Sequence, residues 1–316
     1  MSEKKRIAIY LGWVYGLGLM LTAAIWAATS RAHLDLQGVL VVAGIVFMWF
    51  PACAAIATKR MTHDSEVKLI EYAKPRFKGN TKYYLFACFV PGVLIMAGVI
   101  AYFLVFPRNL DLSMPFITQS LATAGKVAAI PTVTIPMALL ACVALVIVAP
   151  FVLINHVFAF GEEIGWRGYI LPKMVTEWGL VKGIVANGVL WGFGHFPLLL
   201  FGFNYNAHSP ATRIGALLMM GAFACSLGIF LSYLTVKTKS VLPASIAHGA
   251  GNAIGKVGLL VCVTNANAFF GPSFCGLIGF SGLSIVGVYL LARLYREYGP
   301  RKSPAGSSRL RCEELD

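Results

Sequence analysis

The sequence has few charged residues and very few acidic ones. Asp, Glu, Lys and Arg make up 12% of the 316 residues, whereas soluble domains carry about 25%. Asp and Glu together number only 13, while 58% of the residues are hydrophobic and the mean hydropathy is +0.75. An apolar excess of this size cannot be hidden in one water-soluble core, and the composition therefore predicts a membrane protein.

Several familiar site motifs are missing as well. The seven Cys residues form no C-x-x-C pair and show no metal-ligand spacing, and neither H-E-x-x-H nor G-x-S-x-G occurs. These absences weaken a Cys-based metal site and a serine mechanism. Metal bound by other residues is left open.

Long apolar runs are what the sequence has in abundance. A bilayer-spanning helix needs about 20 apolar residues, and in hydrocarbon every backbone amide must be satisfied within its own segment. The sequence therefore predicts an all-α polytopic membrane protein with about eight transmembrane helices. The eight runs are Ile7–Thr29, Gly38–Thr58, Tyr84–Phe106, a long run from Met137 past Phe160, Gly183–Phe201, Ile214–Val236, Val241–Val263 and Gly276–Leu294.

Basic residues are distributed unevenly over the segments between these runs. Lys and Arg number three in the amino-terminal tail, seven between residues 59 and 82, three between 167 and 182, two at 237 and 239, and six from 293 on. These 21 lie on one predicted side, and four lie on the other. The positive-inside rule then places both termini in the cytoplasm. The basic face is expected to attract anionic lipid headgroups, which accounts for the net charge of +13 without nucleic-acid binding.

We divide the chain into four parts on this basis. Residues 1–136 hold three spans and two predicted surface helices, at 63–77 and 115–133. Residues 137–263 form a catalytic core, and 264–298 contain the last span. Residues 299–316 are rich in Gly, Pro, Ser and Arg and are predicted to be disordered.

Polar residues are concentrated in the second half of the apolar sequence. The first group is Glu162-Glu163-Ile164-Gly165-Trp166-Arg167. Adjacent carboxylates point about 100° apart on a helix, so they serve different partners. Glu163 and Arg167 have i,i+4 spacing and can pair, which leaves Glu162 for another task. The alternative interpretation is an ordinary charge cluster at a helix end.

Two further groups follow on later runs. Trp191-Gly192-Phe193-Gly194-His195 places an indole and an imidazole on one helix face, and His248-Gly249-Ala250-Gly251-Asn252 does the same for an imidazole and an amide. The small residues between His248 and Asn252 would let another helix or a substrate backbone approach closely. Lys256 continues the second stripe. A lone His in a membrane helix is often just hydrogen-bonded to a neighbouring helix, and that alternative stays open for each group taken singly.

The three polar groups are predicted to lie at a similar depth in the membrane. With straight helices at 1.5 Å per residue, Glu162 and His248 lie about 15 Å from the cytoplasmic end, and His195 and Asn252 about 20 Å. Ionisable groups at such depth are rare and indicate function. A carboxylate beside two imidazoles and an amide can activate water and stabilise an oxyanion. Glu162, His195 and His248 could alternatively hold a zinc ion with an open position.

The ordered set E-E-x-x-x-R, aromatic-x-x-x-H and H-x-x-x-N resembles the CAAX protease and bacteriocin-processing family of intramembrane endopeptidases. The similarity covers residues 137 to 262. It implies that Glu162 activates water and that Glu163 supports it together with Arg167. It also implies that His195 joins Glu162 at the water or metal, and that His248 and Asn252 bind the oxyanion or complete the site. Trp191 departs from the family, in which Phe is more common, and this difference is not expected to matter chemically.

The predicted function is therefore hydrolysis of a peptide or protein tail at the membrane. Two other classes remain open. One is a proton-coupled transporter, which also uses intramembrane ionisable residues but typically shows inverted repeats that we do not find here. The other is a catalytically idle immunity or scaffold protein. The expected location is the cytoplasmic membrane in a bacterium and the endoplasmic reticulum in a eukaryote.

Overall fold

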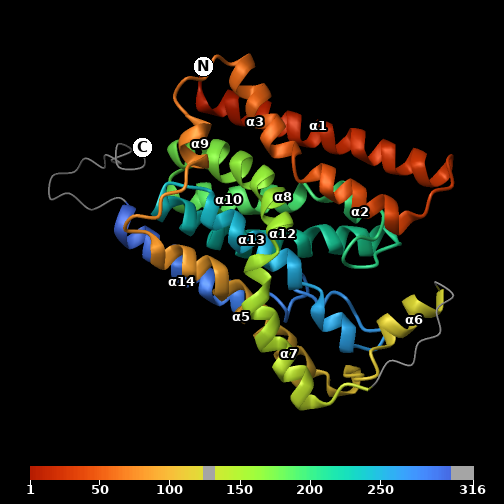
Figure 1. The fold of residues 1–316 in the computed structure, drawn as a ribbon. Helices are drawn as coiled ribbons and strands as arrows, with labels where there is room; N and C mark the ends of the chain where they lie inside the picture. The colour runs from red at the N-terminus through yellow and green to blue at the C-terminus, as the bar shows by residue number, and fades with distance from the viewer. Residues whose placement is uncertain (124–131, 300–316) are drawn as a thin grey trace.

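The computed structural model describes residues 1–123 and 132–299, and this part of the chain is helical with no β-strand (Figure 1). One isolated bridge joins Leu110 and Cys262 within it. The predicted all-α class is confirmed. The helices are α1 Glu3–Ser30, α2 Leu36–Phe47, α3 Phe50–Met61, α4 Leu69–Ala73, α5 Thr81–Val105, α6 Pro115–Thr123, α7 Ile135–Val148, α8 Leu153–Glu163, α9 Leu171–Trp178, α10 Leu180–Phe193, α11 Phe196–Leu199, α12 Pro210–Thr238, α13 Leu242–Ile254 and α14 Ser281–Tyr298.

Helices occur at all eight predicted runs, but they differ in length. Four stretches are long and apolar enough to cross a membrane: α1, α2 with α3, α5 and α12. A fifth forms if Ile135–Phe151 and Leu153–Trp178, which are bent by 60° at their junction, count as one span. At the other three runs α10 has 14 residues, α13 has 13 and α14 has 18. The number eight therefore stays a prediction.

The outer helices turn apolar side chains away from the protein. Leu104 on α5 is 77% exposed, Leu140 on α7 is 70% exposed and Ile285 on α14 is 73% exposed. Exposed apolar surface on this scale is unfavourable in water and suits contact with lipid tails. Together with the spanning helices, it describes an integral multi-pass membrane protein.

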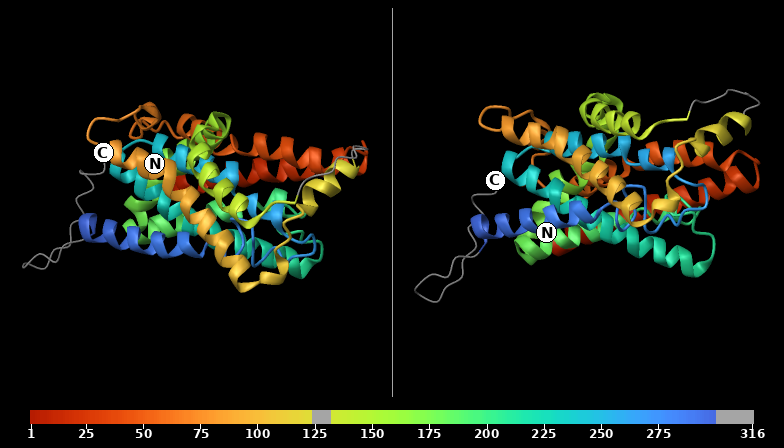
Figure 2. Two further views of the ribbon diagram at one scale, coloured as in Figure 1. Left: turned by 60° about the horizontal axis from the view of Figure 1, so that its bottom comes forward. Right: turned by 90° about the horizontal axis from the view of Figure 1, so that it is seen from below.

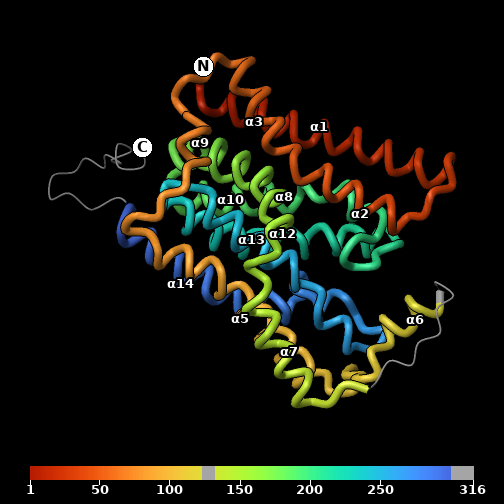
Figure 3. Tube along the Cα trace, viewed as in Figure 1, coloured from red at the N-terminus to blue at the C-terminus, as the bar shows by residue number. Residues whose placement is uncertain are grey.

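The helix α12 lies at the centre of the bundle, where it packs against α10, α13 and α14. The helix α13 packs in turn against α5 and α8. Figure 2 shows the long helices running roughly side by side, and the tube in Figure 3 shows α8, α10, α12 and α13 as neighbours in the middle. This arrangement brings the three polar groups of the sequence into one region.

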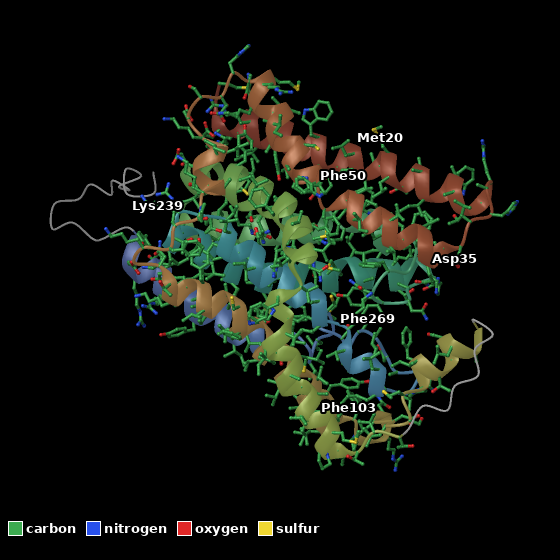
Figure 4. The ribbon with its side chains drawn as sticks, viewed as in Figure 1. Met20, Asp35, Phe50, Phe103, Lys239 and Phe269 are labelled. Atoms are coloured by element: carbon green, nitrogen blue, oxygen red, sulfur yellow. The ribbon has the colours of Figure 1, made fainter. Side chains whose placement is uncertain are left out.

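The two ends of the bundle carry different groups. Lys239 lies near the start of α1 and the end of α14, and Asp35 lies at the opposite end (Figure 4). Asp35 caps α2 by accepting a hydrogen bond from the Gly38 amide at 2.7 Å. At the Lys239 end, the Lys173 ammonium lies 2.7 Å from an Asp64 carboxylate oxygen, and both side chains are buried. The orientation of these ends across the membrane stays a prediction.

The predicted surface helix at 63–77 is much shorter than expected, since only α4 is helical there. Pro75 disfavours helical geometry at the residue before it, and the helix ends at Ala73. The predicted helix at 115–133 begins as α6, and its continuation from 124 lies outside the described residues. The predicted disordered tail lies outside them from residue 300 on.

Candidate active site

Four of the six predicted site residues line one cavity of about 740 Å³: Glu162, His195, His248 and Asn252. Glu162 comes from the last turn of α8, His195 follows α10, and the other two lie on α13. The remaining two, Glu163 and Arg167, are fully buried beside the cavity. The structure thus brings together side chains from segments far apart in the sequence.

The carboxylates sit where α8 passes into a π-helical segment, Ile164–Ile170. Here the packing demands glycine, because a Cβ on Gly165 would collide with the backbone of Pro51 at the start of α3. The wider π turn is a feature often found at functional sites. Close contact with α3 fixes the end of α8 and hence the two carboxylates.

Glu163 is shared between two cationic or polar partners. Its Oε1 accepts hydrogen bonds from Arg167 Nη1 at 3.1 Å and from His248 Nδ1 at 2.9 Å, and no part of its side chain is exposed. A buried carboxylate is stable only when it is paired and hydrogen-bonded. The predicted pair with Arg167 is confirmed. The contact with His248 was not predicted, and it holds the imidazole so that Nε2 is left for other partners.

Glu162 makes a different contact. Trp191 donates from Nε1 to Glu162 Oε2 across 2.5 Å, and Glu162 is only 2% exposed. This charge-assisted hydrogen bond orients the Glu162 carboxylate. The two neighbouring glutamates therefore serve separate partners, as their spacing predicted.

The Trp191 ring contacts almost every other member of the site. The Arg167 guanidinium carbon lies 4.2 Å from the ring centroid, and the rings of His195 and His248 are centred 5.8 and 5.3 Å from it. Sequence reasoning treated Trp191 as a chemically neutral replacement for Phe. The signal that it does more was available, because an indole carries an N–H donor and Phe carries none.

His195 is fixed in one tautomer by its own helix. Its Nδ1 lies 3.0 Å from the carbonyl oxygen of Trp191. A carbonyl only accepts hydrogen bonds, so Nδ1 carries the proton and Nε2 of the neutral ring can accept one. Phe47 from α2 packs against the imidazole with ring centroids 5.0 Å apart.

The stripe on α13 meets α8 closely. A Cβ on Gly249 would overlap the backbone and imidazole of His156, so glycine is needed for the approach that places His248 beside Glu163. Asn252, one turn further, is exposed to the cavity. The predicted role of the small residues on α13, close approach of another helix, is confirmed for Gly249.

A metal site was the open alternative. In residues 1–123 and 132–299, no group of three His, Cys, Asp or Glu side chains is arranged to hold a metal ion. Because the residues as arranged do not fit a zinc ion, we derive no step through one.

Comparison with known proteins singles out the same region. Residues 134–254 match the family model described as type II CAAX prenyl endopeptidase, Rce1-like. Over 88 residues the chain is 30% identical to CAAX prenyl protease 2 of Methanococcus maripaludis, which covers 28% of this chain and 32% of that protein. The alignment thus spans about a third of that relative's length. No solved structure matches the chain.

Proposed function

We propose that the chain, whose residues 134–254 match the Rce1-like CAAX prenyl endopeptidase family model, hydrolyses a peptide bond near the end of a membrane-associated peptide or protein. The observation that carries the proposal is the shared cavity, which Glu162, His195, His248 and Asn252 line together. This set combines acceptors for a water proton with donors for a developing oxyanion.

The attacking water is placed at Glu162. Glu162 Oε1 is free of the Trp191 hydrogen bond, and it takes a proton from water as the water oxygen bonds to the scissile carbonyl carbon. Nε2 of His195, left unprotonated by the contact of Nδ1 with the Trp191 carbonyl, accepts a hydrogen bond from the same water. Glu162 then returns the proton to the leaving amine as the carbon–nitrogen bond breaks.

The oxyanion is stabilised from α13. The Asn252 amide and His248 Nε2 lie one helical turn apart on the same face of that helix. The buried Glu163 carboxylate holds His248 at Nδ1, which leaves Nε2 for the oxyanion. Glu163 therefore acts through His248, with Arg167 holding the carboxylate in place.

The substrate class follows from the family relationship. The archaeal relative is named as a CAAX prenyl protease, and we propose an S-prenylated CAAX peptide as the first substrate to test. The exposed apolar helices place the cavity within a lipid environment, where a prenylated tail is concentrated.

The test is hydrolysis of such a peptide by purified protein in detergent or liposomes. We expect release of the carboxy-terminal fragment by the native protein and a loss of at least about 100-fold in Glu162→Gln, which keeps the size of the side chain but removes the base. Glu71→Gln, a surface carboxylate paired with Lys74, is the matched control and should leave the rate unchanged. Equal rates for Glu162→Gln and the native protein contradict the proposal.

A further inference from the structure

The cavity contains a basic residue that the chemistry above does not use. Lys256 lines the same cavity as the four site residues, and its side chain is exposed there. Its ammonium group lies over the ring of Phe203, with Nζ 4.6 Å from the ring centroid. Phe203 also lines the cavity, so the charged end of Lys256 contacts another residue of the cavity.

Lys256 differs from the buried basic residues elsewhere in the protein. Arg6, Arg167 and Lys173 each pair with a carboxylate. In the described part of the chain, no carboxylate oxygen lies within 4.0 Å of Lys256 Nζ, the distance limit for an ion pair. Glu162 is the one acidic residue among those that line the described cavity, and it is bonded to Trp191. An uncompensated cation at membrane depth is costly, which points to an anionic partner from outside the chain.

The position of Lys256 sets the distance at which that partner binds. Lys256 comes four residues after Asn252, in the turn that follows Ile254, the last residue of α13. Its long side chain extends the reach further. An extended peptide advances about 3.3 Å per residue, so three residues beyond the scissile carbonyl cover about 10 Å. A substrate whose carbonyl lies at His248 and Asn252 can thus bring an anionic group two or three residues downstream to Lys256.

We propose that Lys256 binds the free α-carboxylate at the end of the substrate and thereby selects bonds two or three residues from a carboxyl terminus. This inference rests on the proposed function. It makes Lys256 a specificity-determining residue, because it contacts the substrate's terminus and not the reacting atoms. A lysine that extends to lipid headgroups instead would have no effect on which peptide is cleaved.

The experiment compares two forms of one S-prenylated CAAX peptide, one with a free carboxylate and one with a carboxamide at the carboxyl terminus. The measured quantity is the ratio of kcat/KM for the acid to kcat/KM for the amide. An ion-paired hydrogen bond corresponds to a ratio of about 10 to 100 for the native protein. Lys256→Met should bring the ratio close to one by lowering the rate on the acid alone, and Lys256→Arg should keep the preference.

The control is Lys82→Met, which removes another lysine lying over an aromatic ring, Tyr83, at the start of α5 and away from the cavity. It should keep the native ratio. A native ratio near one, or an undiminished ratio in Lys256→Met, overturns the inference while leaving the endopeptidase intact. If Lys256→Met does not fold, the native ratio and the Lys256→Arg ratio still decide. If the native protein cleaves neither peptide, the proposed function fails first and the inference fails with it.

Discussion

The indole nitrogen of Trp191 donates a hydrogen bond to Glu162, the proposed base, while the same ring lies 4.2 Å from the guanidinium carbon of Arg167. The two glutamates of the motif are thereby connected through one side chain: Glu162 by the N–H edge, and Glu163 through the Arg167 guanidinium on the ring face. Trp191 is thus a positioning residue whose hydrogen bond and ring face can be separated by substitution.

Trp191→Phe is the substitution that separates them. A Phe ring keeps most of the packing but leaves Glu162 Oε2 without its donor, and hydrogen bonds to charged groups contribute about 1.5–3 kcal/mol. We expect kcat for peptide hydrolysis to fall about 10- to 100-fold with KM little changed, and the unfolding temperature to fall as well, because Glu162 is buried. Trp178→Phe at the end of α9 is the control. An unchanged kcat in Trp191→Phe shows that the indole N–H does not position the base.

Substitution of Arg167 is expected to lower the stability of the fold. Removing one partner of a buried ion pair leaves an uncompensated charge and costs about 3–5 kcal/mol. Arg167→Met should therefore lower the thermal unfolding temperature in detergent well below that of Arg60→Met, an exposed control. Adding Glu163→Gln to Arg167→Met should recover part of the loss, since the unpaired charge is then gone. A double variant less stable than Arg167→Met alone contradicts this account of the pair.

Some of the site could be predicted from the sequence because it depends on local spacing. The Glu163–Arg167 pair follows from an i,i+4 relationship within one helix, and its geometry is as expected. The Glu163–His248 hydrogen bond joins residues 85 apart in the chain. It depends on how closely α8 and α13 pack, and only Gly249 hinted at that approach. The Trp191 contact was missed for a chemical reason, because aromatic residues were treated as equivalent.

In the fold, too, the sequence predicts what depends on local pattern and misses what depends on tertiary packing. Apolar runs correctly located the helices, since hydrogen-bond satisfaction in lipid leaves few alternatives to a helix. Their lengths and bends depend on tertiary packing. The junction of α7 and α8 is bent by 60° at Pro150 and its neighbours, and α13 ends after 13 residues. Run length alone could not separate a full span from a shorter buried helix.

The ionic contact between Asp64 and Lys173 predicts a pH dependence of stability. Burial raises the pKa of Asp64, but the hydrogen bond and charge of Lys173 outweigh it, and the net pKa lies below its usual value. A carboxyl group with a lowered folded-state pKa stabilises the fold above its unfolded pKa of about 3.9, and this contribution is lost as the pH falls through the folded value. We expect the unfolding temperature to drop on acidification below about pH 4.

Asp64→Asn isolates this contribution. The variant should be less stable than the native protein at neutral pH, because Lys173 loses a partner, and it should lose less stability on acidification. The measurement is thermal unfolding in detergent at several pH values, with Asp35→Asn as the control, since Asp35 is exposed and Asn can also cap α2. The same acid dependence in Asp64→Asn and in the native protein shows that other groups govern it.

Orientation in the membrane is tested by reporter fusions. The 21-to-4 distribution of Lys and Arg predicts that fusions after Lys78 and after Lys239 report a cytoplasmic location and that a fusion after Asn204 reports the opposite side. In the structure Lys239 lies at the same end of the bundle as the start of α1 (Figure 4). An external signal from the Lys239 fusion reverses the orientation of the whole bundle.

Asn252 separates the two mechanisms of water activation. Its amide is a good hydrogen-bond donor to an oxyanion and a poor zinc ligand, and it lies in the cavity one turn from His248. In a glutamate mechanism, removal of one oxyanion donor costs about 10²–10³-fold in kcat without abolishing substrate binding. Asn252→Ala should show that loss with KM nearly unchanged, and Asn155→Ala in the same cavity serves as the control.

Metal analysis of the same preparations completes the comparison. We expect active protein to hold no stoichiometric zinc and to keep its activity in a strong chelator, because no three His, Cys, Asp or Glu side chains of the described residues are arranged to hold a metal ion. A zinc enzyme instead carries about one metal per chain and loses it together with activity. Recovery of both on adding zinc back, with little effect of Asn252→Ala, assigns Glu162, His195 and His248 as ligands and replaces the glutamate mechanism.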